Sequence, residues 1–65
     1  MTWEKLLDHV DYRHRVWFVK DDNDEWQRAG LHEVLVCFSR LGVTDFGDTM
    51  QKFHQRDKES RARST

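Results

Sequence analysis

The sequence of 65 residues has one cysteine, no proline and no long hydrophobic run, and each of these shortages excludes a class of protein. A single cysteine, Cys37, cannot form an intrachain disulfide, whereas small secreted domains usually depend on several. No segment approaches the ~20 consecutive apolar residues that a membrane-spanning helix needs, and no apolar leader follows Met1. We therefore expect a cytoplasmic protein without a membrane partner.

The residue patterns of common catalytic sites are also absent. The sequence has no nucleophile elbow, no phosphate-binding loop and no dinucleotide fingerprint. A chain of this length has little room for a substrate pocket of the ordinary size of about 300–1,000 Å³. We expect a protein that is not an enzyme, with no cofactor and no small-molecule substrate.

Histidine and cysteine do not recur at the spacing of a zinc site. Zinc ligands on a helix are three or four residues apart, or stand in a Cys-x-x-Cys pair. His9 and His14 are five residues apart, as are His32 and Cys37. We expect no metal site at these residues.

The acidic segment Lys20–Trp26, KDDNDEW, has the composition of a calcium loop but not its spacing. When Asp21 is taken as the first ligand, Trp26 stands at position 6, where glycine is needed. His32 then stands at position 12, where the bidentate glutamate is needed. The segment is therefore predicted to be a turn, because Asp and Asn favour turns.

The residues that are present favour a small folded domain. Hydrophobic residues make up 37% of the chain and include three Trp and four Phe. A chain this short buries only about 60% of its unfolded surface, so its stability as a monomer is marginal. Self-association as a homodimer, or a permanent partner, would bury more.

Apolar residues recur at helical spacing in three segments, so the sequence predicts an all-α fold, a small three-helix bundle. The helices are expected over residues 2–18, 24–41 and 45–56. Suitable capping residues are Thr2, Asp24, Thr44 or Asp45, and Gly42. Residues 1–56 are expected to form one domain, followed by a flexible polar tail at 57–65.

A second interpretation is an α+β fold with a short hairpin at residues 16–29, followed by two helices. Val16–Lys20 is an apolar and partly β-branched run that is also typical of a strand. It could pair with Glu25–Ala29 across a four-residue polar loop. The all-α fold is preferred because Asp24 and Gln27 have the spacing of a capping box.

Because no catalytic site is expected, the sequence indicates a small regulator or inhibitor that binds another protein, or itself, stoichiometrically. Trp26 lies off the apolar stripe of the predicted second helix, and Phe18 flanks the acidic segment. Aromatic and apolar residues would anchor the interface and acids would steer the partner. The candidate protein-binding residues are Phe18, Asp21, Asp22, Trp26 and Val36.

The alternative function is nucleic-acid binding by a small helix-turn-helix-like protein. The turn Leu41–Thr44 resembles that motif, but Asp45 and Asp48 would repel phosphate at the start of the following helix. Basic residues are found further along the chain, in the far half of this helix and in the tail. The candidate nucleic-acid-binding residues are Lys52, Arg56, Lys58, Arg61 and Arg63.

Overall fold

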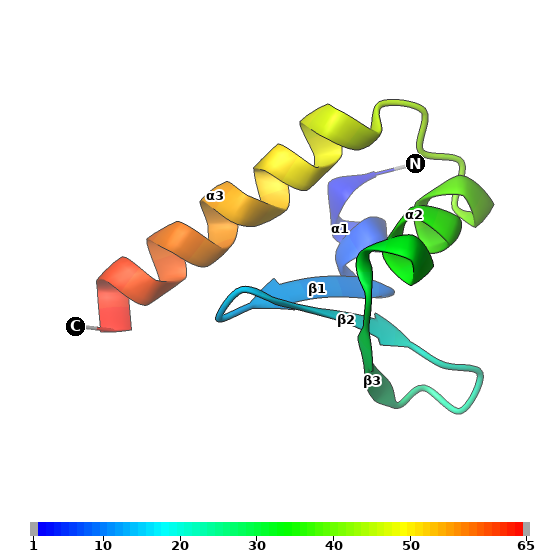
Figure 1. The fold of residues 1–65 in the computed structure, drawn as a ribbon, viewed down its shortest axis with the longest axis horizontal. Coiled ribbons are helices and arrows are strands. Elements are labelled where there is room, and N and C mark those ends of the chain that lie inside the picture. Colours follow the sequence, from blue (N-terminus) through cyan, green and yellow to red (C-terminus); the bar gives the residue numbers. More distant parts are fainter. Residues whose placement is uncertain (1, 65) are drawn as a thin grey trace.

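The computed structural model describes residues 2–64 as an antiparallel sheet with helices packed on one side (Figure 1). The elements in chain order are α1 (Trp3–Leu7), β1 (Val10–Arg13), β2 (Val16–Lys20), β3 (Trp26–Ala29), α2 (Leu31–Arg40) and α3 (Phe46–Ser64). The strands are arranged β1-β2-β3, α2 packs against β2 and β3, and α3 packs against β1. The predicted all-α bundle is therefore wrong, and the α+β alternative with a hairpin followed by two helices fits the structure.

The first predicted helix, residues 2–18, is in fact α1, β1 and the start of β2. Thr2 caps α1 as predicted, since its hydroxyl accepts a hydrogen bond from the Lys5 amide. The helical period gave the wrong prediction because Val10 and Trp17, seven residues apart, share a face both in a helix and in the observed hairpin. In the hairpin, Val10 is opposite Val19, and Trp17 is two residues before Val19 on β2.

The second predicted helix begins later than expected. The predicted capping residue Asp24 lies in the β2–β3 loop with φ of 61°, and α2 begins after Gly30. Residues 26–29 form a strand because β2 offers a pairing partner, with Lys20 opposite Trp26. The predicted end at Gly42 is confirmed, since this glycine has φ of 84° and follows the last helical turn.

The third helix begins at the predicted place and runs further than predicted. The Asp45 carboxylate accepts a hydrogen bond from the Asp48 amide at 3.0 Å, so Asp45 caps α3. The helix continues to Ser64, and residues 57–64 of the expected tail are therefore helical. Thr65 lies outside the described residues. Ion pairs at i,i+4 spacing support this charged helix, as at Arg61 and Asp57.

The core lies between the sheet and the helices. Its buried members come from five elements and are Leu6, Val10, Trp17, Val34, Phe38 and Phe53. Phe53 of α3 is central, because its ring contacts Trp3 at 4.8 Å, Trp17 at 5.4 Å and Phe38 at 6.0 Å between centroids. Among residues 2–64, no helix is both long enough and apolar enough to cross a membrane.

Candidate functional site

The two connections of the sheet lie at opposite ends of β2 and carry opposite charge. Because β2 is antiparallel to both neighbours, the β1–β2 turn and the β2–β3 loop leave it at opposite ends (Figure 1). The β2–β3 loop, residues 21–25, contains four acids and no base. The β1–β2 turn contains His14 and Arg15 and contacts the C-terminal half of α3. The surface charge is therefore divided along the sheet.

We refer to the cations at the end of β1, in the β1–β2 turn and in the C-terminal half of α3 as the basic end. Residues 11–15 and 55–63 contain six Arg or Lys and three Asp or Glu, a formal charge of +3. The cations are Arg13, Arg15, Arg56, Lys58, Arg61 and Arg63. Two segments more than forty residues apart in sequence thus contribute to one charged surface.

A buried carboxylate joins the two parts of the basic end. Asp57 of α3 is 4% exposed, and its Oδ1 accepts a hydrogen bond from the His14 backbone N–H at 2.8 Å. Its Oδ2 lies 3.1 Å from Arg61 Nε, but without the alignment of a hydrogen bond, so the contact is an ion pair. His14 and Arg15 have φ of 50° and 65°, a conformation for which hairpin turns prefer Asn-Gly. Asp57 therefore stabilises a turn whose two residues, His14 and Arg15, both disfavour a positive φ.

A second carboxylate ties the edge strand to α3. Asp11 of β1 lies 2.9 Å from Arg13 Nε and 3.0 Å from Arg56 Nη1. Its side chain is only 15% exposed, whereas those of Arg13 and Arg56 are 55% and 48% exposed. Asp11 and Asp57 are thus turned inward while their cationic partners face solvent. An anion that approaches here meets guanidinium groups first, except near the exposed Glu59.

Two hollows adjoin at Arg13. One, of about 350 Å³, lies between β1 and α3 and is lined by Asp11, Tyr12, Arg13, Arg56, Asp57, Ser60 and Arg63. The other, of about 380 Å³, is lined by Arg13, His14, Val16 and Phe18. Arg13 lines both, so it stands between the charged hollow of the basic end and an aromatic hollow on the sheet.

The side of the sheet that faces away from the helices is called the outer face here. Side chains alternate along a strand, and the buried Val10 and Trp17 point toward the helices, so their neighbours point away. The residues of the outer face are Arg13, Val16, Phe18, Lys20, Trp26 and Arg28. Asp11 also belongs to this side of β1 but turns to Arg56 at the strand edge. Figure 1 shows all three helices on the other side.

Both aromatic rings of the outer face are paired with a cation. The Arg13 guanidinium carbon lies 5.5 Å from the centre of the Phe18 ring, and Lys20 Nζ lies 5.2 Å from the Trp26 ring. Both rings are half-buried. Because no element within residues 2–64 covers this face, it is a half-exposed surface of aromatic rings and cations.

The predicted protein-binding residues do not form one surface. Phe18 and Trp26 share the outer face, and Asp21 and Asp22 are in the loop at one end of it. Val36 is exposed on α2 in the helix layer and lines a different hollow, with Val19 and Cys37 among its neighbours. The role of these residues in binding stays a prediction.

Asp21 organises the acidic loop. Its Oδ1 accepts hydrogen bonds from the Asn23 and Glu25 amides at 2.8 and 3.0 Å, and its Oδ2 accepts one from Gln27 Nε2 at 3.1 Å. The hydrogen bond from the Glu25 amide is the main reason that the pKa of Asp21 is below its ordinary value of 3.8. Partial desolvation opposes this, and the Asn23 and Gln27 donors add to it. Asp21 thus has a structural role inside its own loop.

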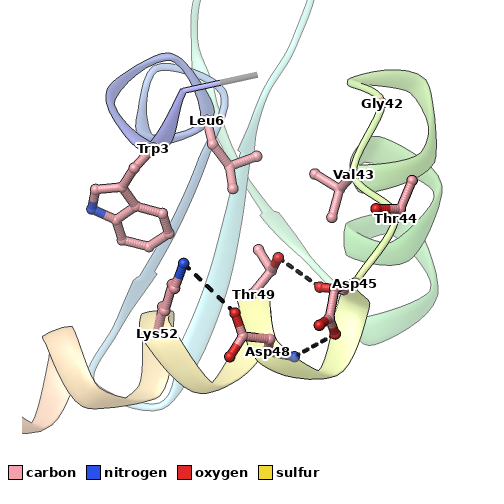
Figure 2. A pocket seen from close by; sticks show the side chains of 9 residues that line it. All are labelled: Trp3, Leu6, Gly42, Val43, Thr44, Asp45, Asp48, Thr49 and Lys52. Atoms are coloured by element: carbon pink, nitrogen blue, oxygen red, sulfur yellow. Dashed lines mark hydrogen bonds and ion pairs between the residues drawn. The ribbon is translucent and has the colours of Figure 1, made fainter.

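Lys52, one of the predicted nucleic-acid-binding residues, is four residues before Arg56 and lines one hollow with it and a second, more acidic hollow near the start of α3. Figure 2 shows it over a hollow of about 330 Å³ near the start of α3, with its Nζ 3.6 Å from Asp48. Asp45 lines the same hollow, and its carboxylate caps the helix. The acids Asp45 and Asp48 make this hollow unsuitable for phosphate. The other four predicted cations, Arg56, Lys58, Arg61 and Arg63, belong to the basic end.

Histidine and cysteine have no shared site. The His54 ring stacks on Tyr12 with centroids 4.6 Å apart, and His14 is in the β1–β2 turn. In the part of the chain that the structure describes, no three His, Cys, Asp or Glu side chains could hold a metal ion together. Cys37 is half-buried, and this burial raises the pKa of its thiol, while the charge of Arg40 acts in the opposite direction.

The sequence interpretation left out Arg13, Arg15 and Arg28 as binding candidates. The signal for Arg15 and Arg13 was their place in a basic run between residues 13 and 20. Their position beside α3 depends on the hydrogen bond between His14 and Asp57, which no local pattern encodes. Comparisons with protein-family models, curated proteins and solved structures give no match to this chain.

Proposed function

We propose that this protein binds nucleic acid through the basic end. The observation that supports the proposal best is the direction of the charged groups: exposed arginines surround carboxylates that are buried, as Asp57 is, or mostly buried, as Asp11 is. Arg13 and Arg56 keep about half of their side-chain surface in solvent while sharing Asp11, which does not. Phosphates could contact these cations without displacing the internal ion pairs, and counterion release would then favour binding.

A purely structural explanation covers only part of the basic end. Arg61 and Arg63 are at the C-terminus of α3, where cations interact favourably with the helix dipole. That explanation does not apply to Arg13, the last residue of β1, or to Arg15, which is in the β1–β2 turn. Arg15 also has a positive φ, a backbone conformation in which glycine would be more stable than arginine. A binding role would account for an arginine at this place.

The proposed mode of binding differs from that of a helix-turn-helix protein. A recognition helix presents its N-terminal residues to DNA, and in α3 these include Asp48, capped by Asp45. Four of the five cations of α3 are in its other half, whose last turns extend past the β1–β2 turn in Figure 1. Phosphate contact is therefore proposed for the C-terminal half of α3 together with the turn.

The proposal is tested by fluorescence anisotropy with a labelled oligonucleotide at about 50 mM and about 200 mM salt, because neutralised phosphates make the affinity salt-dependent. Micromolar binding at the lower salt concentration is expected, with weaker binding at the higher. Arg15→Ala and Arg63→Ala should each weaken binding uniformly across sequences and reduce the salt slope by about 1.

The matched controls are cations on other elements. Arg40 of α2 and Lys5 of α1 are both exposed, so Arg40→Ala and Lys5→Ala remove the same charge from the helix layer. These variants should bind almost as well as the original protein. Equal losses in all four variants would mean that only the net charge matters, and absence of binding at low salt would overturn the proposed function.

A protein partner is the second candidate. Trp, Phe and Arg are enriched among the residues that dominate protein interfaces, and Phe18, Trp26 and Arg28 occur together on the outer face. Light scattering tests the simplest case, a homodimer formed through this face. A dimer that Trp26→Ala converts to a folded monomer would favour this candidate over nucleic acid.

A further inference from the structure

We infer that the nucleic acid is single-stranded and that its bases stack on Phe18 and Trp26 of the outer face. This inference rests on the proposed function and names the class of ligand. Aromatic side chains on an open sheet are a platform for unpaired bases, and each stacked base contributes about 1–3 kcal/mol. Both rings are half-exposed, and within residues 2–64 no helix packs over them.

The arrangement of the two rings favours an extended single strand. Lys20 is opposite Trp26 and Phe18 is opposite Arg28, so the two aromatic residues are diagonal neighbours on adjacent strands. Inside a duplex, each base is covered on both faces by its neighbours in the stack, so paired bases could not stack on both rings. Neighbouring bases must be unpaired and unstacked to do so.

The charges of the outer face favour a polyanion over a protein segment. Arg13, Lys20 and Arg28 surround the two rings, and Asp11, the acid on this side of β1, is occupied by Arg13 and Arg56. Base stacking and cation–π contacts can act together at one ring, because a guanidinium covers part of a ring and leaves the remainder open. Arg13 over Phe18 has this arrangement.

The outer face is also continuous with the basic end. Arg13 lines both the charged hollow, with Arg56 and Arg63, and the aromatic hollow, with Val16 and Phe18. A strand whose phosphates contact the basic end could therefore place its next bases on Phe18 and Trp26. The β2–β3 loop, residues 21–25 with four acids, follows β2 immediately and would repel further phosphates. The nucleic-acid strand should therefore end or turn away near Trp26.

The experiment compares a labelled single strand of about 12 pyrimidine nucleotides with a duplex of the same length, a site size within the ~4–16 nucleotides that single-strand-binding folds cover. The variants are Phe18→Leu and Trp26→Leu, which keep an apolar side chain on the sheet and remove the aromatic ring. Each should weaken single-strand binding about tenfold, with less than about twofold change for the duplex. Circular dichroism establishes that each variant is folded.

Leu31→Ala is the control, because Leu31 is exposed on α2 in the helix layer. It should bind both oligonucleotides as the original protein does. Equal binding of single strand and duplex, unchanged in both leucine variants, would overturn the inference and keep the proposed function. Failure to bind either oligonucleotide would overturn both, and a homodimer that the leucine variants dissociate would assign the outer face to self-association.

Discussion

The two connections of the sheet are stabilised in different ways. The β2–β3 loop is organised from within, because Asp21 accepts hydrogen bonds from Asn23, Glu25 and Gln27, all within six residues of it. The β1–β2 turn is held from outside, by a hydrogen bond from His14 to a carboxylate 43 positions away. One connection is thus a local structure, whereas the other depends on the position of α3.

This difference explains why the acidic loop is formed by one short segment, whereas the basic end needs two segments that are distant in the sequence. A local loop presents its charges whether or not the rest of the chain is folded around it. The β1–β2 turn, which contains Arg15, is held against α3 through His14 and Asp57 only when α3 is docked. The basic end should therefore be lost whenever α3 separates from the sheet, and the acidic loop should not be.

Removal of Asp57 should have the largest effect on stability. Asp57→Ala leaves the His14 amide without its partner and Arg61 without its buried carboxylate. Such losses cost about 2 kcal/mol, which corresponds to roughly 10 °C in melting temperature for a domain of this size. Urea unfolding followed by circular dichroism measures the change.

The matched substitution is Asp21→Ala in the other connection. Because Asp21 is at the surface and its carboxylate bonds only to residues within six positions of it, this variant should unfold closer to the original midpoint than Asp57→Ala does. Asp57→Asn keeps an oxygen acceptor for the His14 amide and should be intermediate. If Asp57→Ala and Asp21→Ala were equally stable, the contrast between remote and local stabilisation would be wrong.

Replacing the two residues of the β1–β2 turn should have the next largest effect on stability, and this change should stabilise the protein. The double variant His14→Asn with Arg15→Gly supplies the residues that favour positive φ at both positions of a two-residue hairpin turn. Relief of the strain should stabilise the protein by about 1 kcal/mol. Thermal unfolding measures it, and Arg15→Ala, which keeps a side chain at φ of 65°, should give no stabilisation.

The same double variant also separates stability from binding. It removes one cation from the basic end while strengthening the fold, so its affinity for an oligonucleotide should fall. Weaker binding by a more stable protein cannot be attributed to partial unfolding. Unchanged binding would exclude Arg15 from the phosphate contacts.

Local signals in the sequence predicted three of the six helix ends, and the preferred all-α interpretation missed the strands. The caps at Thr2 and Asp45 and the glycine at Gly42 act within one turn of the chain, and the structure confirms them. Strand β1 was missed because its pairing with β2 is a relation between segments. Val10 and Trp17 fit one face of a helix as well as one face of a hairpin.

The candidate site was predicted only in part, for a related reason. Four of the five predicted nucleic-acid-binding cations lie at the basic end, because they are close together in one helix. Lys52, about one turn before Arg56, is paired with Asp48 near the start of α3. Phe18 and Trp26 were noticed as unplaced aromatic residues, but only the strand register puts them on one face.

A smaller effect on the loop is expected when the charge of Asp21 is removed and the shape of its side chain is kept. Asp21→Asn keeps an oxygen for the amides of Asn23 and Glu25 but makes a weaker acceptor than a carboxylate. Amide hydrogen exchange should become faster at these two residues, while exchange at His14 stays the same. Faster exchange at His14 would show that the two connections are coupled.

The smallest effect is the response of the same loop to acid. The folded-state pKa of Asp21 lies below its ordinary value of 3.8, chiefly because the Glu25 amide donates to the carboxylate. The ionised form is therefore favoured by the folded loop, and the resulting stabilisation is fully present above pH 3.8. It is lost as the pH falls through the lower folded-state value, where the carboxylate is protonated. NMR titration should show the Asn23 and Glu25 amide signals moving together as the pH falls through the lowered pKa of Asp21. In Asp21→Asn this joint movement should be absent, and its persistence there would assign it to another acid of the loop.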